Sequence, residues 1–130
     1  MTDPAKTMVS PYIDYLGIKI IHMENGIAEM ELELTDDFKN SGGMAHGGVL
    51  ASLADSAAGS AAFTIVPANQ IAVTTDFTMT CLRSTVSGTL YARAEMIHTG
   101  KRFMRAEVKI RSARDLLVTA GVSFMVVERR

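Results

Sequence analysis

A Gly-rich loop and the helical pattern after it hold the residues of this sequence best suited to chemistry. Gly42, Gly43, Gly47 and Gly48 lie close together, just before the apolar pattern of a helix. Unpaired N–H groups at a helix start favour negative charge, so the backbone near Gly47 is a candidate donor to a polarised carbonyl oxygen. Asp55 adds a carboxylate two turns further along, which suits a general base or a nucleophile.

The spacing of these two groups has a consequence for assembly. Gly47 and Asp55 are eight residues apart, about 12 Å along a helix axis. Both cannot act on one carbonyl group at that separation. If both are catalytic, a second copy must place its helix antiparallel, so that Asp55 of one copy meets Gly47 of the other. A two-fold dimer makes two identical sites in this way, so we expect a homo-oligomer.

The helix that positions Asp55 has a continuous apolar stripe. Its members recur at the spacing of one helix face, and they are Leu50, Leu53, Ala54, Ala57, Ala58, Ala61 and Ala62. Because most of them are alanine, this helix can approach its neighbours closely. Asp55 lies at the rim of the stripe, where a carboxylate is partly desolvated and can still reach a cavity.

Composition predicts one domain spanning residues 1–130, with 48% hydrophobic residues and a net charge of −1. That balance predicts neither a nucleic-acid nor a membrane partner. The N-terminus has no apolar signal region, and no apolar run reaches the ~18 residues of a membrane span. Cys81 is the single cysteine, which favours a reducing cytoplasm. The three histidines are widely spaced, so we expect no metal site.

Alternating segments predict the strands. Asn25–Gly26 is a strong hairpin turn signal, and the segment after it buries alternate residues. The predicted strands are Gly17–Met23, Ile27–Leu34, Ile71–Leu82, Thr89–His98, Arg102–Arg111 and Leu117–Val127. We also expect a short helix within Ala5–Tyr15 that Pro11 breaks. Each strand has one apolar face and only one long helix can cover it, so we predict an α+β fold with an antiparallel sheet of five to six strands wrapped around one long central helix.

The pattern resembles the hotdog-fold acyl-CoA thioesterases, from about Tyr12 to Val127. It is most similar to the branch of the phenylacetate-pathway and 4-hydroxybenzoyl-CoA thioesterases. The signature of that branch is N-x-x-G-x-x-H-G-G followed by a helix with an acidic residue. It occurs here as Asn40, Gly43, His46, Gly47 and Gly48, followed by Asp55. Two further segments, Thr74–Ser84 and His98–Arg102, are similar to the family's next strand and to its hairpin near coenzyme A.

The resemblance implies specific roles. Asp55 is the nucleophile or general base, the Gly47 N–H polarises the thioester carbonyl, and Asn40 positions water or the carbonyl. Thr74 falls where some relatives orient the attacking water. His46 is a further candidate, although such a residue more often orders its loop. Asp55 could instead cap or pair with a basic residue, Asn40 could only hold its loop, and Thr74 could be an ordinary strand residue.

Coenzyme A belongs to the substrate in this reading, and no separate cofactor is implied. Its phosphates are expected to contact basic and hairpin residues, namely Arg83, Ser84, Gly100, Lys101 and Arg102. The family often has proline where Ser84 stands and Asp-Gly where Ala113–Asp115 stands. These departures affect turns rather than the proposed chemistry.

Two other functions stay open. A hydratase or dehydratase acting on 2-enoyl-CoA uses the same fold, but pairs a histidine with an acid, and no such pairing is evident here. A non-catalytic acyl-CoA-binding module is the second alternative. The resemblance implies a dimer, with two dimers joined in a tetramer, and leaves open the acyl group and the choice between direct attack and water activation.

Overall fold

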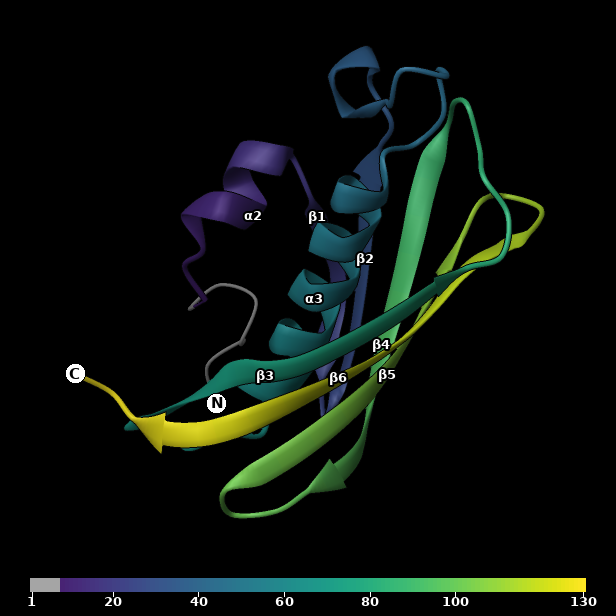
Figure 1. Ribbon diagram of the computed structural model, residues 1–130. Helices are drawn as coiled ribbons and strands as arrows, with labels where there is room; N and C mark the ends of the chain where they lie inside the picture. Colours follow the sequence, from purple (N-terminus) through teal and green to yellow (C-terminus); the bar gives the residue numbers. More distant parts are fainter. Residues whose placement is uncertain (1–7) are drawn as a thin grey trace.

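The computed structural model describes residues 8–130 and folds into one antiparallel sheet around a long helix (Figure 1). The elements are α2 (Pro11–Leu16), β1 (Lys19–Glu24), β2 (Ile27–Glu33), the 3₁₀ turn η1 (Asp36–Phe38), α3 (Gly47–Phe63), β3 (Gln70–Cys81), β4 (Thr89–Thr99), β5 (Phe103–Arg111) and β6 (Leu116–Glu128). The sheet order is β1-β2-β4-β5-β6-β3. Six strands and one long helix confirm the predicted architecture.

The β1–β2 hairpin shows how local sequence sets the register. Asn25 and Gly26 both have positive φ, 50° and 79°, as a two-residue type I′ turn requires. The turn fixes the pairing of Glu24 with Ile27. In β2 the side chains of Ala28 and Met30 are then buried, as the alternation predicts.

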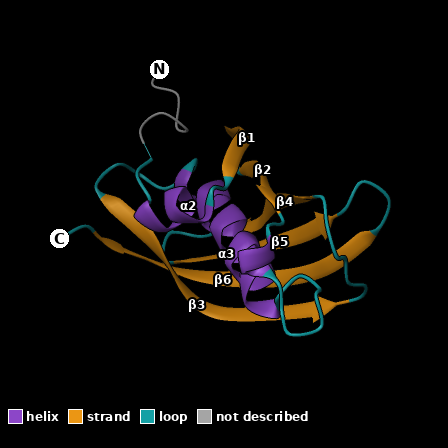
Figure 2. Cartoon of the chain, turned by 90° about the horizontal axis from the view of Figure 1, so that it is seen from above, coloured by secondary structure: helices purple, strands orange, loops and turns teal. Residues whose placement is uncertain are grey.

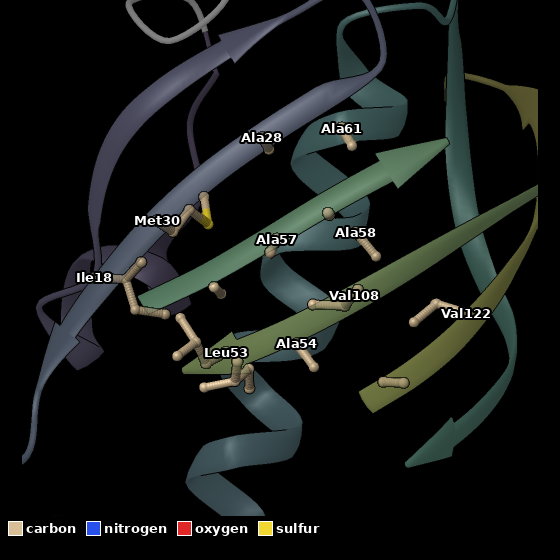
Figure 3. Packing of buried hydrophobic residues seen from close by; sticks show 14 of the residues in the cluster. Ile18, Ala28, Met30, Leu53, Ala54, Ala57, Ala58, Ala61, Val108 and Val122 are labelled. Carbon is tan, nitrogen blue, oxygen red and sulfur yellow. The ribbon is translucent and has the colours of Figure 1, made fainter. Parts of the chain in front are cut away.

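Helix α3 is buried along the stripe of small residues that the sequence indicates. Leu53, Ala54, Ala57, Ala58 and Ala61 are fully buried. Figure 3 shows these residues facing side chains of the sheet, among them Met30, Val108 and Val122. Because alanine side chains are short, the sheet can curl closely around the helix. This packing fixes which residues of α3 face outward, and Asp55 is one of those at the boundary.

Helix α2 differs from the prediction. Pro11 does not break a helix but begins one, because proline is tolerated at the first helical position, where its missing N–H has no intrahelical partner. The Ser10 side chain accepts a hydrogen bond from the Ile13 N–H, and Gly17 ends the helix in the left-handed region. The part of the predicted helix before residue 8 lies outside the described residues.

Helix α2 lies beside α3 in both Figure 1 and Figure 2. Two of its side chains, Ile13 and Leu16, belong to the core. None of the helices within residues 8–130 is long and apolar enough to cross a membrane.

Strand β3 closes the sheet on one side and pairs only with β6, so one long edge of it is unpaired within residues 8–130. Figure 2 shows β3 and β1 at opposite edges of the sheet. The register of β3 against β6 shifts between Thr74 and Asp76, which makes Thr75 a β-bulge. The Thr75 hydroxyl donates a 3.4 Å hydrogen bond to the Ser123 carbonyl oxygen and so holds the bulge against β6.

Candidate active site

Asp55 lies on the outer rim of α3 and is half-buried. Its Oδ1 accepts a hydrogen bond of 2.8 Å from the hydroxyl of Thr74 on β3. Within residues 8–130 no Lys, Arg or His side chain lies within salt-bridge distance of this carboxylate, and Oδ2 has no hydrogen-bond partner. A role in a structural ion pair therefore does not explain Asp55.

The bulge at Thr75 aims Thr74 at the helix. Thr74 lies opposite Phe124, and Phe77 lies opposite Val122, so both are on the inner face of the sheet. In a regular strand, residues three apart point to opposite faces. Because the bulge adds one residue between them, Thr74 and Phe77 point to the same face, and bulges beside functional sites commonly redirect a side chain in this way. Both side chains thus reach the Asp55 side of α3.

An open hollow of ≈ 270 Å³ surrounds this pair. Its two large side chains are Tyr12 of α2 and Phe77 of β3. The remaining lining is small or polar: Ala51, Ser52, Asp55, Ser56 and Thr74. Tyr12 and Phe77 are not among the site residues predicted from the sequence. The position of Tyr12 depends on how α2 docks, and that of Phe77 depends on the bulge, and neither has a local sequence signal.

The start of α3 presents one N–H group to the outside. His46 is the N-cap, and its Nδ1 accepts a hydrogen bond of 2.7 Å from the Gly48 N–H. This assigns the remaining ring proton of a neutral His46 to Nε2. The Gly47 N–H has no acceptor within residues 8–130, and Gly47 is exposed. It is therefore available to an oxygen from outside the protomer.

Asn40 orders the Gly-rich loop. Its Oδ1 accepts hydrogen bonds from the backbone N–H of Gly42 at 2.9 Å and of Met44 at 3.1 Å. The side-chain carbonyl oxygen is thus used within the loop, and the amide nitrogen is the part left for other contacts. The loop, in turn, leads into the first turn of α3.

A single protomer does not bring the two central groups together. Gly47 is the first residue of α3, and Asp55 follows it by eight residues on the same straight element, so about 12 Å separates them along the axis. Apart from the sequence neighbours His46 and Gly47, the one pair of predicted catalytic residues joined by a hydrogen bond within residues 8–130 is Asp55–Thr74.

The predicted coenzyme A contacts fall into two separate groups. Arg83 and Ser84 follow the end of β3, where the Ser84 hydroxyl lies 3.1 Å from the sulfur of Met44. Lys101 and Arg102 lie in the β4–β5 hairpin, in a hollow shared with Gln70 at the start of β3. Since β3 has twelve residues, about 36 Å separates its two ends.

The local structure of the β4–β5 hairpin explains why residue 100 is a glycine. A Cβ at this position would lie 2.8 Å from the Phe103 carbonyl oxygen, which the Gly100 N–H already binds across the hairpin. The glycine is therefore needed by the turn, whatever its role toward a ligand.

A larger hollow of ≈ 650 Å³ lies on the opposite face of the sheet. Its lining includes Glu29, Arg93, Glu107 and Lys109, which point away from α3. It contains none of the predicted site residues, so its size alone does not make it the site. Within residues 8–130 no three His, Cys, Asp or Glu side chains gather as metal ligands would.

Comparisons with known proteins show which proteins this chain is similar to. A family model described as the thioesterase superfamily matches residues 42–119. The chain is 30% identical over 115 residues to the 1,4-dihydroxy-2-naphthoyl-CoA hydrolase of Listeria monocytogenes, in a match that covers 88% of this chain and 94% of that protein.

Two solved structures are similar over nearly the whole chain. PA5202, a conserved protein of Pseudomonas aeruginosa, matches with a TM-score of 0.89 and 26% identity, over 94% of this chain and 98% of that one. A mutant of the phenylacetic acid degradation protein PaaI of Thermus thermophilus matches with a TM-score of 0.83 and 30% identity, over 89% of this chain and 98% of that one.

Proposed function

The chain belongs to the thioesterase superfamily and is a thioester hydrolase, and we propose that it cleaves acyl-CoA thioesters to a free acid and coenzyme A. The observation that carries this proposal is the Asp55 carboxylate in its open hollow. Thr74 holds it by a hydrogen bond, and no Lys, Arg or His side chain of residues 8–130 forms an ion pair with it. The naphthoyl-CoA in the name of the Listeria relative supports a coenzyme A ester as substrate.

Asp55 would act on the thioester in one of two ways. It either takes a proton from water, which then attacks the acyl carbon, or attacks that carbon directly and forms an anhydride that water hydrolyses. Thr74 fixes one carboxylate oxygen, so the other is left for the reaction. The Thr74 oxygen also keeps lone pairs that can accept a hydrogen bond from the attacking water.

The negative charge that forms on the carbonyl oxygen during the reaction needs a hydrogen-bond donor to stabilise it. In the tetrahedral state the carbonyl oxygen becomes an oxyanion, and a preorganised N–H at a helix start stabilises it. Gly47 offers such an N–H, unused by its own protomer within the described residues. When the C–S bond breaks, coenzyme A leaves as a thiolate and receives a proton, so water is consumed and acid and thiol are the products.

We further propose that each site is shared between two copies of the chain. The gap of about 12 Å between Gly47 and Asp55 in one protomer supports this sharing. The unpaired edge of β3 gives a second copy a place to pair, because its exposed N–H and C=O groups are a template for another strand. An antiparallel β3–β3 pair would extend the sheet and place two α3 helices antiparallel.

The outer face of α3 fits such an approach. Gly59 lies in the helix interior, where glycine costs about 1 kcal/mol relative to alanine. A Cβ there would meet no atom of residues 8–130 within 4 Å, so the described part of the fold does not explain the glycine. A close neighbouring helix would explain it.

The same arrangement would unite the two groups of coenzyme A contacts. Antiparallel pairing brings the end of one β3 beside the start of the other. Arg83 and Ser84 of one copy would then lie near Lys101 and Arg102 of the other. A tetramer would join two such dimers, and light scattering measures which assembly forms in solution.

We also propose a cytoplasmic location. The free thiol of Cys81 is exposed, which suits a reducing compartment.

The experiment that tests the function is release of free thiol from a panel of acyl-CoA esters. The panel includes short and medium fatty acyl, phenylacetyl and naphthoyl esters, with hydration of a 2-enoyl-CoA assayed in parallel. Asp55→Asn keeps the shape of the side chain and should lower kcat by about 10²–10⁴-fold, because it removes the base or nucleophile. Undiminished hydrolysis by a folded Asp55→Asn protein would refute the assignment.

A further inference from the structure

A hydrogen-bonded chain ties Tyr12 to the start of the catalytic helix. The Ser52 hydroxyl donates to the Gly48 carbonyl oxygen at 2.9 Å, and a carbonyl can only accept. The single Ser52 proton is thus used, so in the 2.7 Å contact with Tyr12 the phenol must be the donor. The ring of Tyr12 is therefore held in one orientation above the first turns of α3.

Docking of α2 does not itself require this ring. Ile13 and Leu16 enter the core and hold α2 in place, while Tyr12 is 54% exposed. Tyr15 on the same helix is 83% exposed and does not line the hollow beside Asp55. Of the two tyrosines of α2, only Tyr12 is directed at the site.

The two aromatic rings determine the space available in that hollow. On the α3 side the lining is small, with Ala51, Ser52 and Ser56. Tyr12 and Phe77 are the only large side chains of the described residues that border it. Tyr12 lies on helix α2 rather than on a flexible loop, and its hydroxyl is hydrogen-bonded to Ser52. A smaller side chain at this position would therefore enlarge the hollow directly.

We infer that Tyr12 is a specificity-determining residue that limits the size of the acyl group beside Asp55. This inference rests on the proposed function. The hollow of ≈ 270 Å³ in one protomer exceeds the ~150 Å³ cavity that holds a benzene ring, and an acyl group of one ring fits within it. An acyl group that extends toward α2 meets the Tyr12 ring, which borders the hollow on that side.

The test compares Tyr12→Ala, Tyr12→Phe and the matched control Tyr15→Ala with the unmodified protein. The measured quantity is the ratio of kcat/KM for a two-ring acyl-CoA to that for a one-ring acyl-CoA. Tyr12→Ala should raise this ratio by roughly tenfold or more, the scale at which a pocket discriminates small differences in bulk. Tyr12→Phe keeps the ring and should stay close to the unmodified ratio, as should Tyr15→Ala. An unchanged ratio in a folded Tyr12→Ala protein overturns the inference.

A binding measurement separates this inference from the proposed hydrolysis. Thioether analogues of the same two esters cannot be hydrolysed, and calorimetry gives their Kd values for each variant. If the protein binds the analogues without turning over the esters, the proposed hydrolysis fails, and the Kd ratios still decide the role of Tyr12. If it neither binds nor hydrolyses them, both proposals are overturned. Tyr12→Leu provides a second reduced side chain should Tyr12→Ala fail to fold.

Discussion

Gly47 is a glycine that the fold of residues 8–130 does not require. An added Cβ would meet no atom of the described residues within 4 Å, and the φ of Gly47 is not in the left-handed region. Its N–H has no acceptor within residues 8–130, whereas the neighbouring Gly48 N–H is bound by His46. A substrate carbonyl oxygen or a second copy of the chain, approaching from outside, would give a physical reason for a glycine there.

Proline at position 47 would remove this donor alone. Proline is tolerated at the first helical position, and His46, with ψ of 136°, already has the extended backbone that precedes proline. Gly47→Pro should lower kcat by about 10²–10³-fold while thermal melting stays unchanged. Gly47→Ala keeps the N–H and controls for added bulk. Equal turnover in the two variants would contradict an oxyanion role.

The predictable part of the site is the part carried by one helix. Asp55 and Gly47 follow from helical periodicity and from the donors at a helix start. Thr74 is predicted only through the resemblance, because its contact with Asp55 depends on the bulge in β3. Tyr12 is forty residues from Ser52 in sequence, so no local pattern links them.

The start of α3 depends on His46 as its cap. The ring Nδ1 accepts the Gly48 N–H, and a Cβ at Gly48 would lie 2.9 Å from that nitrogen. Gly48 is therefore a glycine because the cap lies against it. This local reason differs from that at Gly47, although the two stand side by side in the sequence.

A pair of variants separates capping by His46 from chemistry. His46→Ala removes the cap and should lower the free energy of unfolding by about 1 kcal/mol. His46→Asn restores a strong capping side chain, so stability and turnover should both return toward normal. Chemical denaturation and thiol release measure the two effects. A stable His46→Asn protein without turnover would instead assign the ring a chemical step.

At the scale of elements, hydrophobic alternation in most segments and a high content of Val, Thr and Phe in Ile71–Leu82 predict every strand to within about two residues, a common boundary uncertainty. Alternation succeeded because each strand buries one face on α3. It could not place the bulge at Thr75, since a single unpaired residue leaves no mark in a strand rich in threonine. The error at Pro11 came from treating proline as a breaker where it serves as the first helical residue.

At the scale of the whole molecule, one protomer keeps the residues proposed to act together apart from one another along α3 and β3. Asp55 of α3 and Thr74 of β3 lie partway along their elements, while Gly47 and the Arg83 segment lie toward one end, where the Ala45 N–H donates to the Thr85 carbonyl oxygen. The Lys101 hairpin lies at the other end. A two-fold axis beside β3 is the operation that would combine them.

Mixed dimers test this sharing directly. One chain carries Asp55→Asn and the other Gly47→Pro, with different affinity tags, so that only mixed assemblies survive two purification steps. If sites are shared, one of the two sites in each dimer is intact and roughly half of normal turnover should return. Turnover no higher than that of either variant alone would place each site within one protomer.

The bulge at Thr75 makes the length of β3 as important as its composition. Deleting one residue there would restore unbroken alternation and turn either Thr74 or Phe77 outward. Insertions and deletions near this point should therefore be more harmful than most substitutions. When related sequences are aligned across β3, a gap placed at the bulge keeps the residues that correspond to Thr74 in the same column, and so preserves the contact between its hydroxyl and the Asp55 carboxylate.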